Sequence, residues 1–293
     1  MDNPKSKIVM FLVLALALSA IGWIPIIRAG TLAGGGGLWV LAVMWSPAIA
    51  AILTRLVTQH NVRGIGWIPR TPKLLGLAYV LPLLYAAPVY LLVWTTGIAG
   101  FNAGKWAVQA GLTPVSGLVL LATVGVIASL ISALGEEIGW RGLLVPELAK
   151  VTNFRNTALI SGVIWASWHM PLVFGADYHG KGTPVAYSVV CFTAMVMATS
   201  FIMAWIRLKS NSVWPAALLH ATHNLFVQGV FDLATVDKAS TGWWTGEFGA
   251  GLAITITVAA FLLTRFYKVE GTVQIGERPA AVDRAGPLNS TTT

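Results

Sequence analysis

Two adjacent carboxylates, Glu136 and Glu137, interrupt an apolar stretch of the sequence, and Arg141 follows four residues after Glu137. On a helix, an acid four residues before an arginine is in the favourable order for an ion pair. Glu136 would point about 100° away from Glu137, at 3.6 residues per turn, and would stay unpaired. An unpaired, partly desolvated carboxylate can accept a proton from water as a general base. The alternative is that all three charges cap a helix end among lipid headgroups.

Two histidines recur in later apolar segments. His169 lies in IWASWHMPLVF at 164–174, and His220 lies in LLHATHNLF at 218–226, with Asn224 one turn further on the same helical face. A lone histidine in such a segment usually bonds a neighbouring helix. Two of them, with an asparagine and paired acids, could instead supply the base, oxyanion donors or metal ligands of peptide hydrolysis.

Composition indicates where this chemistry takes place. The chain has 293 residues, of which 56% are hydrophobic and 10% charged, and its mean hydropathy is +0.73. These values are typical of a polytopic membrane protein. Because burying an ionisable group at bilayer depth costs about 2.5 kcal/mol or more, such groups indicate a functional site.

Other classes of protein are disfavoured. The single cysteine, Cys191, excludes a disulfide within the chain and a cysteine-rich metal site. The net charge of +8 is scattered over short loops, which favours contact with membrane lipid over nucleic acid. The strings HExxH and GxSxG and a P-loop are absent, so serine hydrolase and NTPase functions have no support.

The apolar segments predict an all-α fold, a bundle of about eight transmembrane helices, since crossing the hydrocarbon core takes about 20 apolar residues. We expect this bundle to occupy residues 1–268, with the chemical motifs within 130–230, and a polar, disordered cytoplasmic tail to follow at 269–293. The expected helices are 8–27, 38–57, 74–94, 115–134, 157–174, 185–208, 213–231 and 249–267.

Basic residues alternate along the connections. The start of the chain and the second, fourth and sixth connections are rich in Lys and Arg, whereas the intervening connections hold few. The positive-inside rule therefore predicts a multi-pass protein of the cell membrane with both termini in the cytoplasm. In this reading Arg141, Lys150 and Arg155 mark the fourth connection.

Three motifs carry a resemblance to a known family. EEIGWR at 136–141 is similar to EExxxR, WASWH at 165–169 to FxxxH with Trp165 in place of Phe, and HATHN at 220–224 to HxxxN. Together they resemble the type II CAAX endopeptidases, also called CAAX proteases and bacteriocin-processing enzymes, a group of intramembrane proteases. The substitution at Trp165 puts the shape of the cavity in question more than activity.

The resemblance implies an endopeptidase whose helices enclose a cavity open to the cytoplasm. Glu136 and His169 would activate water, His220 and Asn224 would stabilise the oxyanion, and Glu137 with Arg141 would orient the site. The mechanism could use this water alone or a zinc ion, and the candidate zinc ligands are Glu136, His169 and His220.

The substrate would be a peptide or protein, lipidated in the case of CAAX-type C-terminal processing, or a peptide in bacteriocin maturation or self-immunity. Two alternatives from other classes stay open: a catalytically silent membrane scaffold or immunity factor, and a proton-coupled transporter, which would also bury Glu, His and Arg. The transporter lacks support from repeat symmetry in the sequence.

Overall fold

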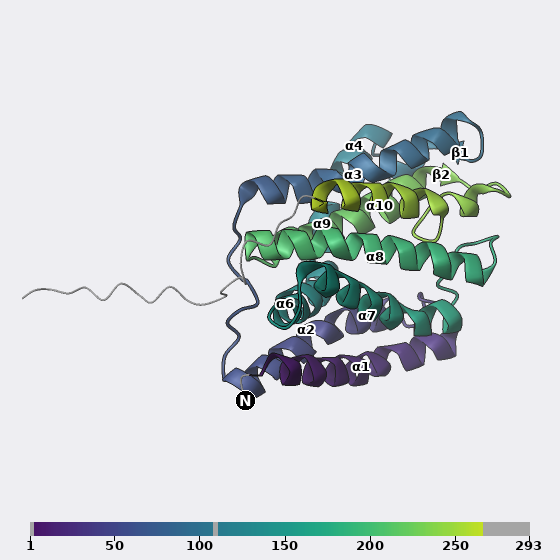
Figure 1. Ribbon diagram of the computed structural model, residues 1–293. Helices are drawn as coiled ribbons and strands as arrows, with labels where there is room; N and C mark the ends of the chain where they lie inside the picture. The colour runs from purple at the N-terminus through teal and green to yellow at the C-terminus, as the bar shows by residue number, and fades with distance from the viewer. Residues whose placement is uncertain (1–2, 108–110, 266–293) are drawn as a thin grey trace, which may run out of the picture.

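The computed structural model describes residues 3–107 and 111–265, and these form a bundle of long helices that run roughly side by side (Figure 1). The fold class expected from the sequence, an all-α polytopic membrane protein, is confirmed. The elements are α1 (Pro4–Ala29), α2 (Leu38–Gln59), α3 (Pro72–Thr95), β1 (Gly100–Phe101), η1 (Ala103–Trp106), α4 (Pro114–Leu120), η2 (Leu121–Gly125), α5 (Val126–Gly139), η3 (Trp140–Leu144), α6 (Val145–Ala149), α7 (Phe154–Gly175), α8 (Val185–Ser210), α9 (Trp214–Asn224), η4 (Leu225–Asp232), β2 (Thr235–Val236), η5 (Thr241–Trp243) and α10 (Ala250–Thr264).

Six helical segments of the described residues are long and apolar enough to cross a membrane. The expected seventh segment, 213–231, corresponds to α9 and its continuation η4, which together run from Trp214 to Asp232. Of the eighth segment, the structure describes the 15 residues of α10. The expected end of the eighth segment at 267 and the expected tail at 269–293 lie outside the described residues.

The fourth segment differs most from its expected bounds of 115–134. It runs as one helical stretch of 36 residues from Pro114 to Ala149, because the stretches η2 and η3 are π-helical and continue the helix. Arg141, expected in the fourth connection, lies inside η3 and is fully buried. A hydropathy count ends the helix too early here because its polar residues face protein and not headgroups.

Glycines in the GEEIGWRG motif bring this helix close to α2. A Cβ at Gly139 would lie 2.4 Å from the Pro47 Cβ and 2.8 Å from the Pro47 carbonyl oxygen, and one at Gly135 would lie 2.7 Å from the Met44 carbonyl oxygen. Small residues of this kind let helix backbones approach in membranes. The contact fixes the face of α5 that carries the two glutamates.

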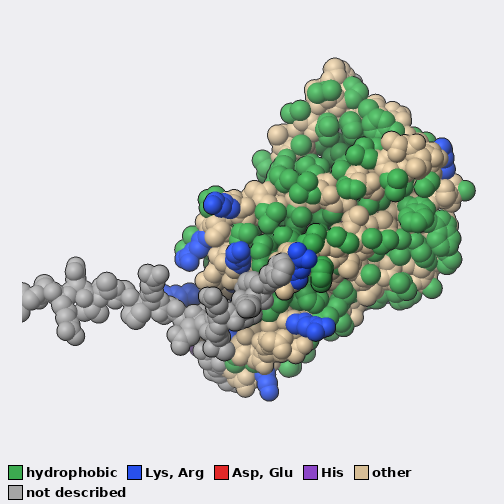
Figure 2. Space-filling view, turned by 45° about the horizontal axis from the view of Figure 1, so that its top comes forward, with side chains coloured by type: hydrophobic (Ala, Val, Ile, Leu, Met, Phe, Trp, Pro, Cys, Tyr) green, Lys and Arg blue, Asp and Glu red, His purple; other side chains and the backbone are tan. Residues whose placement is uncertain are grey.

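The two ends of the bundle differ in charge. The end that carries the α2–α3, α6–α7 and α8–α9 connections, with the start of α1, is called the basic end here, and Figure 2 shows Lys and Arg gathered mostly toward it. The opposite end, called the far end, carries the short antiparallel β1–β2 pair. Basic residues at or near the basic end are Lys5, Lys7, Arg55, Arg63, Arg70, Lys73, Lys150, Arg155, Arg207, Lys209 and Arg265.

Candidate active site

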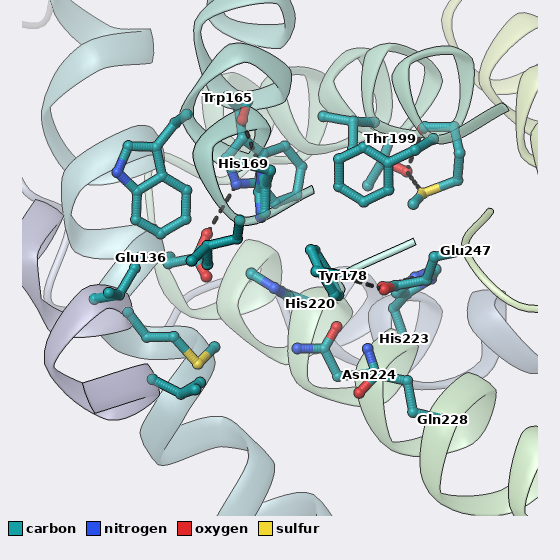
Figure 3. A pocket seen from close by; sticks show the side chains of 18 of the residues that line it. Glu136, Trp165, His169, Tyr178, Thr199, His220, His223, Asn224, Gln228 and Glu247 are labelled. Carbon is teal, nitrogen blue, oxygen red and sulfur yellow. Dashed lines mark hydrogen bonds and ion pairs between the residues drawn. The ribbon is translucent and has the colours of Figure 1, made fainter. Parts of the chain in front are cut away.

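A cavity of about 170 Å³ lies inside the bundle and holds four of the six site residues expected from the sequence. Glu136 from α5, His169 from α7, and His220 and Asn224 from α9 line it, and Figure 3 shows their side chains around one space. The other two, Glu137 and Arg141, lie behind the cavity wall and are fully buried. The packing of α5 against α9, and the hydrogen bond from Trp165 of α7 to Glu136 of α5, thus join three motifs that are distant in sequence.

Glu136 is buried, with 3% of its surface exposed. Its Oε2 accepts the indole N–H of Trp165 at 2.8 Å and that of Trp140 at 3.3 Å. Among the described residues, no hydrogen bond reaches Oε1 and no cation pairs with this carboxylate. Glu136 is therefore an oriented carboxylate with one oxygen left to accept a proton from water in the cavity.

Trp165 contributes more than the sequence indicated. Its indole N–H donates to Glu136, a bond that phenylalanine at this position could not make. The Arg141 guanidinium also lies over its ring, 4.2 Å from the centroid. The difference from the family motif therefore places a hydrogen-bond donor on the site carboxylate.

Glu137 forms the expected ion pair with Arg141, with 2.9 Å between Oε1 and Nη1. The same Oε1 lies 2.9 Å from Nδ1 of His220. Arg141 further reaches Ser200 Oγ at 3.5 Å, and its carbonyl accepts the Nε–H of Arg207 at 2.7 Å. The pair thus holds His220 by one nitrogen and ties α5 to α8.

In both site histidines, Nδ1 contacts the protein and Nε2 has no protein partner among the described residues. Nδ1 of His169 donates to the Trp165 carbonyl at 2.8 Å, and Nδ1 of His220 faces Glu137. Each imidazole therefore has Nε2 left for water, substrate or a ligand. Asn224 is half-buried, and its side-chain amide makes no hydrogen bond among the described residues.

A zinc ion at this site would need Glu136, His169 and His220 as its ligands. A carboxylate or carbonyl partner on Nδ1 is the usual second contact of a metal-binding histidine. Within residues 3–107 and 111–265, however, no three His, Cys, Asp or Glu side chains are arranged to hold a metal ion. The described geometry therefore gives no support to a zinc site formed by Glu136, His169 and His220.

A second polar cluster lines the same cavity and was missed from the sequence. Glu247, in the connection before α10, accepts the Tyr178 hydroxyl at 3.0 Å and lies 3.3 Å from Nε2 of His223, whose Nδ1 meets the Tyr85 hydroxyl at 2.8 Å. The sequence signal was weak, because Glu247 and Tyr178 stand in loops with no motif around them. Only His223 was close to a recognised motif.

Electrostatics determine the protonation of Tyr178 and Glu247 in this cluster. Burial and the negative charge of Glu247 raise the pKa of Tyr178 well above its usual value, so the phenol stays protonated and donates. Burial alone would raise the pKa of Glu247, but His223 and the Tyr178 hydroxyl hold it below its usual value. The carboxylate therefore stays ionised at neutral pH.

The part of the chain that contains the three motifs is similar to known proteins. Residues 118–226 match the family model described as type II CAAX prenyl endopeptidase Rce1-like. This match supports the family that the three motifs resemble. The chain is also 27% identical over 127 residues to CAAX prenyl protease 2 of Methanococcus maripaludis, a match over 42% of this chain and 43% of that protein. The chain thus matches less than half the length of this relative.

The matched region contains all six site residues expected from the sequence. Their placement together is a finding of the structure, whereas their roles in a reaction are not tested by the comparisons. The similarity to the type II CAAX endopeptidases supports a peptidase in general and leaves the mechanism and substrate to be proposed.

Proposed function

We propose that this protein is an intramembrane endopeptidase that hydrolyses peptide bonds with a water activated by Glu136. The observation that carries the proposal is the oriented carboxylate itself: a buried Glu136 with Oε2 fixed by two indoles and Oε1 directed at no protein donor. The family similarity over 118–226 supports hydrolysis of a peptide bond as its chemistry.

The remaining residues have distinct roles in the proposal. Glu136 accepts a proton from water with the help of His169, and the hydroxide attacks the peptide carbonyl. Glu136 then gives this proton to the leaving amine as the C–N bond breaks. His220, whose Nδ1–H is held by Glu137, donates from Nε2 to the developing oxyanion in its protonated form, together with the Asn224 amide. Arg141 holds Glu137 and stacks on Trp165, so it orients both carboxylates.

The substrate belongs to the proposal as well. The relative is named CAAX prenyl protease 2, and the lining of the cavity also includes apolar side chains, among them Val40, Val43 and Phe192. These side chains suit an apolar peptide side chain or an attached lipid. CAAX-type processing, peptide maturation and self-immunity stay candidates. The position of the cavity does not support the expected access from the cytoplasm, because the cavity does not reach the basic end.

The test compares Glu136→Gln with Asp177→Asn in purified protein in lipid vesicles. Glu136→Gln should lower the rate of peptide cleavage by about 10² to 10⁴, because the amide keeps the shape but cannot take a proton. Asp177 is 77% exposed and outside the cavity, so its variant should cleave normally. Undiminished cleavage by the Glu136→Gln variant would show that Glu136 is not the general base.

A second arm of this experiment addresses the metal. Because the mechanism proposed uses no zinc, a chelator such as 1,10-phenanthroline should leave the wild-type rate unchanged. Loss of cleavage that added zinc restores would instead favour the metalloprotease alternative. A folded protein that cleaves no peptide in a proteome-derived library would favour the silent scaffold.

A further inference from the structure

The catalytic cavity does not reach the basic end. None of its lining residues belongs to the α2–α3, α6–α7 or α8–α9 connections, whereas Leu32, Tyr178 and Glu247 come from connections at the far end. The cavity therefore extends from Glu136 away from the basic residues, and Figure 3 shows Tyr178 and Glu247 beside the site histidines.

The basic end is closed by packed polar groups. Nη2 of Arg207 donates to the Gly64 carbonyl at 3.0 Å, and Nη2 of Arg55 donates to the Gly142 carbonyl at 3.1 Å and lies 3.5 Å from Glu147. Ile65 lies among them and is fully buried. These bonds tie the α2–α3 connection to η3 and α8, so they separate the glutamates from the basic end.

A second cavity lies at the far end and adjoins the first. It measures about 540 Å³ and is formed by the α7–α8 connection, η4 and the connection before α10. Tyr178, Gln228 and Glu247 line both cavities. We call this far-end cavity the vestibule.

The partition between the two cavities is a contact between loops. The hydroxyl of Tyr178 donates to Glu247 Oε2 at 3.0 Å, and the Tyr178 ring packs edge-on against Phe248 with centroids 5.0 Å apart. Both partners lie in connections, where the backbone can move without breaking a helix. Gln228 is exposed and makes no hydrogen bond among the described residues, so it adds little to the barrier.

The vestibule walls suit an extended peptide. Gly180 and Gly182 on one connection and Gly242 and Gly246 on the other all line it. A Cβ at Gly182 would meet nothing within 4 Å, whereas one at Gly242 would lie 2.2 Å from the Lys181 carbonyl oxygen. Gly182 therefore leaves room for a second backbone to approach closely. We propose, on the basis of the proposed peptidase function, that the vestibule is the entrance by which water and an extended peptide reach Glu136, and that the Tyr178–Glu247 contact closes it.

Cysteine accessibility tests the entrance without needing a substrate. In a Cys191→Ser background, single cysteines replace Gln228 at the partition and Thr199 in the inner cavity, and a charged, membrane-impermeant methanethiosulfonate is added to either side of sealed vesicles. Cysteines at Ser240 and Asn211, both exposed, mark the far and basic sides. The cysteine at 228 should react from the Ser240 side, and the one at 199 slowly from that side.

Removing the Tyr178–Glu247 contact should raise the rate at which the cysteine at 199 is labelled. Tyr178→Ala should raise the labelling rate at 199 by about tenfold or more, the change expected from losing a hydrogen bond to a charged acceptor. Tyr187→Ala is the matched control, since Tyr187 bonds the Trp243 carbonyl at the same end but lines neither cavity. If Tyr178→Ala does not fold, Tyr178→Phe removes only the hydroxyl and should raise the same rate.

Two results would overturn the entrance: labelling of both positions only from the Asn211 side, or a rate at 199 that neither Tyr178 variant changes. Both are independent of catalysis. A Glu136→Gln variant that still cleaves peptide would defeat the proposed function and leave the labelling pattern intact, so the two failures can be told apart.

Discussion

At the scale of single residues, the site pairs one carboxylate that we propose to react with one that holds its neighbours. Glu136 accepts only indole donors, whereas Glu137 binds Arg141 and His220 through one oxygen. Two adjacent acids thus receive different surroundings because they point to different faces of one helix. The same division of roles between paired acids was expected from their spacing to Arg141.

Removing the arginine should destabilise the protein. Arg141→Ala leaves Glu137 buried with no permanent cation, and breaking a buried pair in this way costs about 3 to 5 kcal/mol. Thermal unfolding of the detergent-solubilised variant should show a clearly lower midpoint together with lower cleavage. Arg155→Ala, at an exposed position, should change the midpoint little, and an equal effect of the two variants would argue that the pair is not structural.

Asn224 should act on the transition state alone. Its amide lines the cavity beside His220 without a protein partner, as a donor reserved for the oxyanion would. Asn224→Ala should therefore lower kcat by about 10² to 10³ with KM almost unchanged. Steady-state kinetics on a cleaved peptide measure both values, and a rise in KM alone would assign Asn224 to substrate binding.

At the scale of elements, the position of the glutamates depends on how closely α5 approaches α2. The glycines that permit this contact stand in the same short motif as the acids, and their packing role was not predicted from the sequence. The depth of the site depends on this packing: hydropathy ended the fourth helix near residue 134, whereas the structure continues it to Ala149. Periodicity could not show this, because buried charges inside a bundle look like a helix end in the sequence.

A methyl group in this contact should be costly. Gly139→Ala would place its Cβ 2.4 Å from the Pro47 Cβ, and overpacking of this kind costs about 1 to 3 kcal/mol. Gly76→Ala in α3 is the matched control, since a Cβ there meets nothing within 4 Å, and alanine favours a helix by up to about 1 kcal/mol. Thermal unfolding should separate the two, and equal midpoints would mean that α2 moves aside freely.

At the scale of the whole molecule, composition was enough to predict the membrane class and the helical fold, and three motifs were enough to predict four of the residues that line the cavity. The second cluster was beyond reach, because Tyr178 and Glu247 meet only after the far-end connections fold over the cavity. The sequence also could not predict toward which end of the bundle the cavity extends. The charge pattern indicates which end faces the cytoplasm, but only packing around Arg55 and Arg207 shows which end is closed.

The orientation of the bundle is the last prediction, and charge alone supports it. Because the α2–α3, α6–α7 and α8–α9 connections carry most basic residues, the basic end should face the cytoplasm. In a Cys191→Ser background, Asn211→Cys should react with an impermeant thiol reagent only in inverted vesicles, and Ser240→Cys only in intact cells. Asn211 is the suitable position because it is exposed, whereas Ser210 beside it is buried. Labelling of both from one side would contradict the eight-segment topology, and labelling with the sides exchanged would turn the vestibule toward the cytoplasm while leaving its link to Glu136 intact.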